Sequence, residues 1–157
     1  PALPGLFEQL AAAADPAAAA PLEAAIWAIW TRHPDPLVEQ LMGKAALAMR
    51  RGDGGQAERA LDQVVALAPG YAEGWSRRAP LYYLAGRPGD SLREIERVLR
   101  RGPRHFGALS GKGLVLVALD RPDEAIAAFT AALAVHPNMS SVSDNLEALW
   151  RNVGKDI

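Results

Sequence analysis

Apolar and small residues recur along residues 38–139 with the spacing of a helix face, in three consecutive stretches. Each stretch closes with a proline, and Pro69, Pro103 and Pro137 lie 34 residues apart. Within each stretch two such stripes flank a short polar break, which predicts three helical hairpins at 38–71, 72–105 and 106–139. The matching positions are Leu41, Ala45, Ala48, Ala57, Leu61 and Val64; then Trp75, Ala79, Tyr82, Ser91, Ile95 and Val98; then Leu109, Gly113, Leu116, Ala125, Phe129 and Ala132.

The breaks contain residues suited to ending one helix and beginning the next. The first two, RGDGG and AGRPGD, place Gly52 and Gly86 where a helix C-terminus favours left-handed backbone, and Asp120 takes that place in the third, LDRPDE. Pro88 and Pro122 fall in the first turn of the following helix, where a missing N–H is tolerated. Because one hairpin cannot bury its own apolar faces, we expect the hairpins to stack.

This 34-residue pattern resembles the tetratricopeptide repeat, in which W-x2-L-G-x2-Y is followed by A-x3-F and P. Residues 38–139 carry three units, of which the third matches best and the first least. The resemblance implies an all-α fold, a right-handed solenoid of stacked helical hairpins. It also implies that the first helix of each hairpin lines a concave groove that binds peptides.

Both ends of the chain depart from the repeat. Residues 140–153 predict one amphipathic helix, so we expect 140–157 to form a capping helix and tail. Ser141 and Asp144 have the spacing of a capping box at its start. Residues 6–14 and 21–34 predict a degenerate hairpin within 1–37, out of register with the repeat by one residue.

Composition supports an all-helical chain and excludes several kinds of chemistry. The 157 residues include 31 alanines, which favour helices, and no cysteine. Disulfides, thiolate zinc sites and iron–sulfur clusters are therefore excluded. No apolar run reaches the ~18–20 residues that a membrane-spanning helix needs, so we expect no transmembrane segment.

No set of residues indicates catalysis, a metal or a cofactor. Of the three histidines, His33 and His136 each precede a helix-closing proline and are expected to reach the last helix carbonyls, while His105 lies at a repeat junction where it could contact a ligand. The segment GALSGKG at 107–113 lacks phosphate-loop spacing and falls inside a predicted helix. We therefore expect a protein that is not an enzyme and has no cofactor.

Positive charge is concentrated in residues 77–104, which carry eight arginines against three acids. Arg93, Arg97, Arg100 and Arg104 have helix spacing and predict one stripe on the second helix of the second hairpin. This stripe is either a solvated face or a docking surface for an acidic partner or anionic lipid. The net charge of −1 and the lack of interleaved aromatic residues argue against nucleic acid.

The resemblance places specific residues in the concave groove. In the best-known subtype, Lys and Asn side chains bind a C-terminal carboxylate. The residues found here at those positions are Met42, Ala46, Arg77, Gly107 and Gly111. Of these, only Arg77 could bind a carboxylate. The projected groove positions are Glu39, Met42, Gly43, Ala46, Met49 and Arg50; Glu73, Ser76, Arg77, Pro80, Tyr83 and Leu84; and Gly107, Ser110, Gly111, Leu114, Val117 and Ala118.

From these positions we expect a partner-binding surface that holds an apolar peptide or amphipathic helix bearing an acidic group. Methionine adapts to varied surfaces and tyrosine offers a flat anchor with a polar tip. The expected binding residues are Met42, Met49, Arg50, Arg77, Tyr83, Leu114 and Val117.

Two alternatives remain at this point. The apolar N-terminal hairpin, with Trp27 off the Leu22–Ile26–Ile29 stripe, could drive self-association, or the arginine stripe could dock an acidic partner. The chain begins at Pro1, so we expect that a signal peptide, a tag or another domain preceded it. Resemblance to an exported bacterial subtype favours the periplasm over the cytoplasm.

Pro80 lies inside the helix predicted at 72–85. Proline there removes a bond to the carbonyl of Ser76 and favours a kink. Either tight packing tolerates this cost, or the released carbonyl contacts a ligand.

Overall fold

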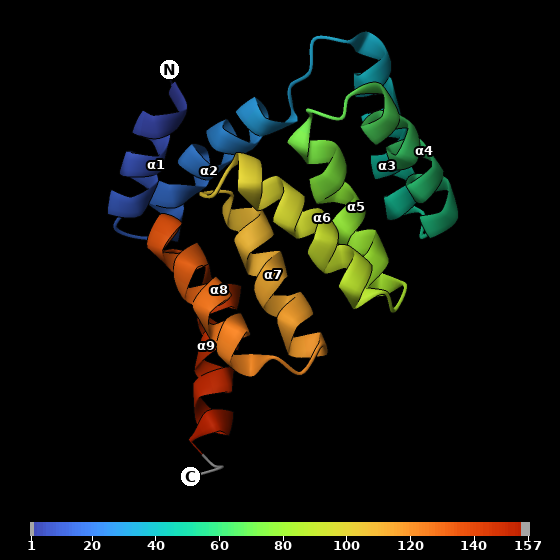
Figure 1. Cartoon of the computed structure of the whole chain (residues 1–157). Helices are drawn as coiled ribbons and strands as arrows, with labels where there is room; N and C mark the ends of the chain where they lie inside the picture. The colour runs from blue at the N-terminus through green and yellow to red at the C-terminus, as the bar shows by residue number, and fades with distance from the viewer. Residues whose placement is uncertain (1, 155–157) are drawn as a thin grey trace. The chain divides into compact units, whose positions relative to one another are not determined.

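The computed structural model describes residues 2–154, and within them all regular secondary structure is helical (Figure 1). The predicted all-α fold of helical hairpins is confirmed. The helices are α1 (Ala2–Ala12), α2 (Pro16–Thr31), α3 (Pro36–Arg50), α4 (Gly54–Leu67), α5 (Ala72–Leu84), α6 (Pro88–Arg101), α7 (Phe106–Ala118), α8 (Pro122–Val135) and α9 (Ser140–Val153).

The helices form two compact units. One, here called the central unit, is Trp30–Pro103 and contains α3 to α6. The other, the terminal unit, joins the N-terminal helices, as far as Ile29, to the chain from Arg104 onward. Each unit buries its own set of apolar side chains.

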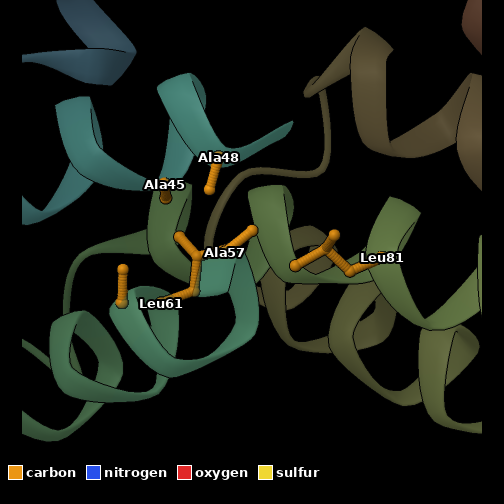
Figure 2. Close-up of a cluster of buried hydrophobic side chains, with 6 residues drawn as sticks. Ala45, Ala48, Ala57, Leu61 and Leu81 are labelled. Carbon is orange, nitrogen blue, oxygen red and sulfur yellow. The ribbon is translucent and has the colours of Figure 1, made fainter. Parts of the chain in front are cut away.

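The central unit consists of two hairpins, α3/α4 and α5/α6, with α4 packed against α5. Small residues line the contacts and allow the helix backbones to approach closely. One cluster of buried side chains joins α3, α4 and α5 (Figure 2). Its members are Ala45 and Ala48 of α3, Ala57, Ala60 and Leu61 of α4, and Leu81 of α5.

Charged side chains reinforce the same packing. Arg78 of α5 lies between Asp62 of α4, with Nη1 2.9 Å from Oδ1, and Glu94 of α6. The contact with Glu94 is bidentate, at 3.0 Å from Nη2 and 3.3 Å from Nε. Both Arg78 and Glu94 are largely removed from solvent, so each charge depends on the other.

The turns between paired helices agree with the sequence prediction. Gly52, Gly86 and Asp120 have φ angles of 73°, 74° and 56°, in the left-handed region. Pro88 and Pro122 each begin a helix, as predicted. Local sequence therefore determines where each hairpin reverses.

The terminal unit is built on the α7/α8 hairpin. Gly113 of α7 faces the Phe129 ring of α8 so closely that a Cβ at 113 would lie 2.3 Å from Cε1. The helix predicted at 140–153 is confirmed as α9, which packs on α8 and buries Val142. The predicted capping box at Ser141 and Asp144 is wrong, because α9 begins at Ser140 and Ser141 lies within its first turn.

The N-terminal helices also belong to the terminal unit. α1 contacts α8, and Trp27 of α2 packs edge-on against Phe106 of α7, with ring centroids 5.8 Å apart. The second N-terminal helix is expected to begin at residue 21, whereas α2 begins at Pro16. Asp15 accepts a hydrogen bond from the Ala18 backbone N–H and so fixes this earlier start.

No helix within residues 2–154 combines the length and the apolar character needed to cross a membrane.

Two glycine substitutions should have opposite effects on stability. Gly43→Ala in α3 meets no atom within 4 Å, so it should raise the free energy of unfolding by about 1 kcal/mol through helix propensity. Gly113→Ala should lower it by ~1–3 kcal/mol, because the new methyl group displaces the buried Phe129 ring. Urea unfolding of both variants measures the difference, and equal effects would contradict the packing described for α7 and α8.

Candidate functional site

A cavity of about 360 Å³ lies between α3 and α5 in the central unit. Its floor includes Ala45 and Leu61, which belong to the buried cluster of Figure 2. The residues that line it are Met42, Ala45, Ala46, Met49 and Arg50 of α3, Leu61 of α4, and Arg77 and Pro80 of α5. We call this the α3–α5 cavity.

Helix periodicity explains why methionines line it. The core face of α3 is formed by Val38, Leu41, Ala45 and Ala48. Met42 and Met49 are seven residues apart and lie beside that face, so the core does not fully cover them. Met49 is 37% exposed, so part of its apolar side chain remains accessible in the cavity.

The charged side chains of the cavity are two arginines. Arg50 is exposed at the end of α3. Arg77 lies with Nε 3.5 Å from Oε2 of Glu73, one turn earlier on α5. Glu73 is only 1% exposed, so this projected groove position is part of the interior, while the Arg77 side chain remains 46% exposed.

Tyr71, two residues before Glu73, contacts the C-terminal end of α2. Its hydroxyl donates to the carbonyl of Thr31, and its ring lies 4.9 Å from that of His33. Burial, followed by the negative charge of Glu73, raises the pKa of Tyr71 from 10.0 to about 12. Tyr71 is therefore held neutral by its surroundings well above its ordinary range.

The structure brings together four of the seven expected binding residues, Met42, Met49, Arg50 and Arg77. Tyr83 is 38% exposed on α5, outside the residues that line the cavity. Leu114 and Val117 are exposed on α7, which belongs to the terminal unit.

One projected groove position is covered by the chain itself. A Cβ at Gly107 would lie 2.8 Å from Cη2 of Trp27, so the indole occupies the space that a larger side chain would need. The sequence patterns did not predict this contact. Its two signs in the sequence are Trp27, which lies off the apolar stripe of its helix, and Gly107, which takes a projected groove position on another helix.

The histidines have structural partners that differ from those expected. His33 Nδ1 accepts from the backbone N–H of Asp35 at 3.1 Å, and buried His136 places Nε2 2.9 Å from the carboxylate of Glu23. Neither caps the preceding helix carbonyls, so that expectation is wrong. His105 is buried and accepts from the Ala108 N–H at the start of α7, which leaves it unavailable to a ligand. Within residues 2–154, no group of three or more His, Asp or Glu side chains could hold a metal ion.

The four arginines of the predicted stripe do not form one continuous surface. Arg93 pairs with Asp90, and the guanidinium of Arg97 lies 4.3 Å from the centre of the Trp75 ring. α6 ends at Arg101, so Arg104 lies beyond the helix, in the terminal unit, 4.5 Å from the Phe7 ring. The interpretation of four arginines on one helix is therefore wrong for Arg104.

Comparison with known proteins supports the repeat pattern. A tetratricopeptide repeat family model matches residues 76–140. A TPR repeat-containing protein of Rhizobium etli is 33% identical over 144 residues, which is 92% of this chain and 71% of that protein.

Two solved structures show the same fold at low sequence identity. The Sgt2 TPR domain from Aspergillus fumigatus has a TM-score of 0.73 and 21% identity, covering 78% of this chain and 83% of that one. The first TPR of Spaghetti (RPAP3), bound to the HSP90 peptide SRMEEVD, has a TM-score of 0.72 and 16% identity, covering 74% and 95%.

Replacing Pro80 should stabilise the central unit. α5 continues through Pro80, so Pro80→Ala restores a helix donor and should raise the free energy of unfolding by up to ~3 kcal/mol. Thermal unfolding followed by circular dichroism measures this change. A variant that melts no higher than the parent would contradict the view that proline strains this helix.

Alkaline pH should destabilise the protein through Tyr71. Because its folded pKa is raised from 10.0 to about 12, the stability it contributes is complete below pH 10 and is lost as pH rises to about 12. Tyr71→Phe should reduce the slope of unfolding free energy against pH over this range. The pKa of Tyr82 is also raised by burial, so the slope should shrink without vanishing. Tyr83→Phe at an exposed site is the matched control, and equal slopes in the two variants would contradict the assignment.

Proposed function

We propose that this chain, which belongs to the tetratricopeptide repeat family, is a non-catalytic module that binds a segment of a partner protein in the α3–α5 cavity. The observation that carries the proposal is the convergence of Met42, Met49, Arg50 and Arg77 on one cavity above the buried core. Apolar and basic surface thus lie within reach of the same ligand.

The lining indicates the chemistry of the bound segment. Methionine side chains adapt their shape to an apolar anchor, and covering a half-exposed methionine removes further apolar surface from water. Arg50 and Arg77 add positive charge beside that surface. The segment that fits best carries an apolar side chain for the cavity and an acidic side chain for its rim.

The structural neighbours support peptide binding but not the same ligand. The RPAP3 domain of similar fold is bound to an HSP90 peptide. In this chain Met42 and Ala46, both of which line the cavity, stand at two of the positions where carboxylate-gripping members carry Lys and Asn. We therefore favour recognition centred on an apolar anchor over recognition of a terminal carboxylate.

Peptides selected by display against the wild-type chain provide the probe. They should be enriched in an apolar residue close to Asp or Glu. Met49→Glu should weaken their binding by about 2 kcal/mol, or roughly thirtyfold, because it places a charge where the anchor is buried. Affinity is measured by fluorescence anisotropy, and circular dichroism checks that helicity is unchanged.

The matched control is Leu84→Glu, the same kind of change at a residue of α5 that is 74% exposed and outside the cavity lining. Arg50→Gln should weaken binding less, with an effect that decreases as salt concentration rises. Arg50 is preferable to Arg77 for this test because Arg77 also forms an ion pair with the buried Glu73. Equal losses for Met49→Glu and Leu84→Glu would place the binding surface elsewhere.

A further inference from the structure

A second cavity in the central unit, of about 270 Å³, is lined by Pro69, Trp75, Arg97, Arg100 and Arg101. It shares no residue with the α3–α5 cavity. Its wall is the turn between α4 and α5 together with the Trp75 indole, whose Nε1–H donates to the Pro69 carbonyl at 3.1 Å. The C-terminal part of α6 supplies the three arginines, with Arg100 and Arg101 in its last turn and Arg97 just before it.

The guanidinium groups converge because of helix spacing. Arg97, Arg100 and Arg101 are related by i, i+3 and i+4 and so occupy one face of α6. Arg97 lies over the Trp75 ring at 4.3 Å. Arg101 extends to the α4–α5 turn, where its Nη1 would lie 3.6 Å from a Cβ placed at Gly70. Three positive charges therefore border one small space with an aromatic wall.

These charges are not neutralised by neighbouring carboxylates. Across residues 2–154, no Asp or Glu oxygen lies within ion-pair distance of Arg97, Arg100 or Arg101. Other arginines of α5 and α6 do have carboxylate partners: Arg78 pairs with Glu94, and Arg93 pairs with Asp90. The α6 dipole favours basic residues at its C-terminus but does not cancel three full charges.

We propose that this second cavity binds the phosphate group of a phosphate monoester. A monoester dianion offers three terminal oxygens and nearly two negative charges to the three guanidinium forks, whereas a carboxylate would offset only one charge. The Trp75 and Pro69 wall would pack against the group that carries the phosphate. This assignment concerns a different ligand and different residues from the proposed function, and neither depends on the other.

Phenyl phosphate is the probe, because it combines a dianion with a ring that can pack on the wall. Isothermal titration with the full chain should show saturable binding that weakens as salt rises. Two-dimensional NMR of the ¹⁵N-labelled chain should show a shift of one indole N–H resonance, assigned to Trp75 through its loss in Trp75→Phe. Benzoate, with the same ring and a single charge, should bind at least tenfold more weakly.

Arg100→Gln combined with Arg101→Gln should weaken phenyl phosphate binding at least tenfold. Both residues are exposed, so folding should be retained, and thermal unfolding checks this. Arg93→Gln is the matched control, since it removes one arginine from the same helix outside the cavity. Failure of phenyl phosphate to saturate, equal binding of benzoate, or unchanged affinity in the double variant would each overturn the proposal.

One further ligand identifies the source of the phosphate. A short phosphotyrosine peptide that binds at least tenfold more tightly than phenyl phosphate would support a phosphorylated side chain of a partner. Equal affinities would support a small phosphate ester as the ligand.

Discussion

The two helices of a hairpin can pack closely only where small side chains occupy the positions at which they meet. Ala45, Ala48 and Ala57 serve this purpose in the central unit, and Gly113 lets the Phe129 ring lie against the α7 backbone in the terminal unit. Small residues on one helix make room for the neighbouring helix and, at Gly113, for a large side chain on it. This complementarity fixes the spacing of the helices, on which the buried charges and both cavities depend.

The same constraint explains why larger side chains collect at the edge of the core. Because alanines fill the contact between α3 and α4, Met42 and Met49 lie beside that contact and border the α3–α5 cavity. In the α5/α6 hairpin, Arg78 lies between the carboxylates of Asp62 and Glu94. Among the described residues, Arg100 and Arg101, at the end of α6, have no such carboxylates beside them. Burial and pairing thus separate the arginines that hold helices together from those that remain available.

The sequence predicted the hairpins closely because their ends are determined locally. Gly52 and Gly86 have the backbone angles that their positions indicated, and the helix expected at 72–85 is found at Ala72–Leu84. Four expected binding residues line one cavity. The resemblance assigned the groove to the first helix of each hairpin, and helix periodicity decides which residues of that helix share a face.

Contacts between distant segments could not be predicted in this way. Trp27 over Gly107, and His136 beside Glu23, join residues that no periodic pattern relates. The cavity at Trp75 was missed because it depends on where α6 ends and on the side-chain conformations of its last arginines. Single-sequence patterns define elements well, but they do not show how a glycine and a tryptophan from different elements fit together.

The pairing of His136 with Glu23 spans 113 residues, and Asn138 donates to the carbonyl of Ala13 across 125. Ordinary repeat arrays fold through contacts between neighbouring repeats, so that order can propagate along the chain as it is made. Here the N-terminal helices share a core with helices that are synthesised only after the whole central unit. Their apolar faces must therefore remain uncovered during translation until α7 and α8 emerge, and the loop that closes at that point makes this the entropically costly step of folding.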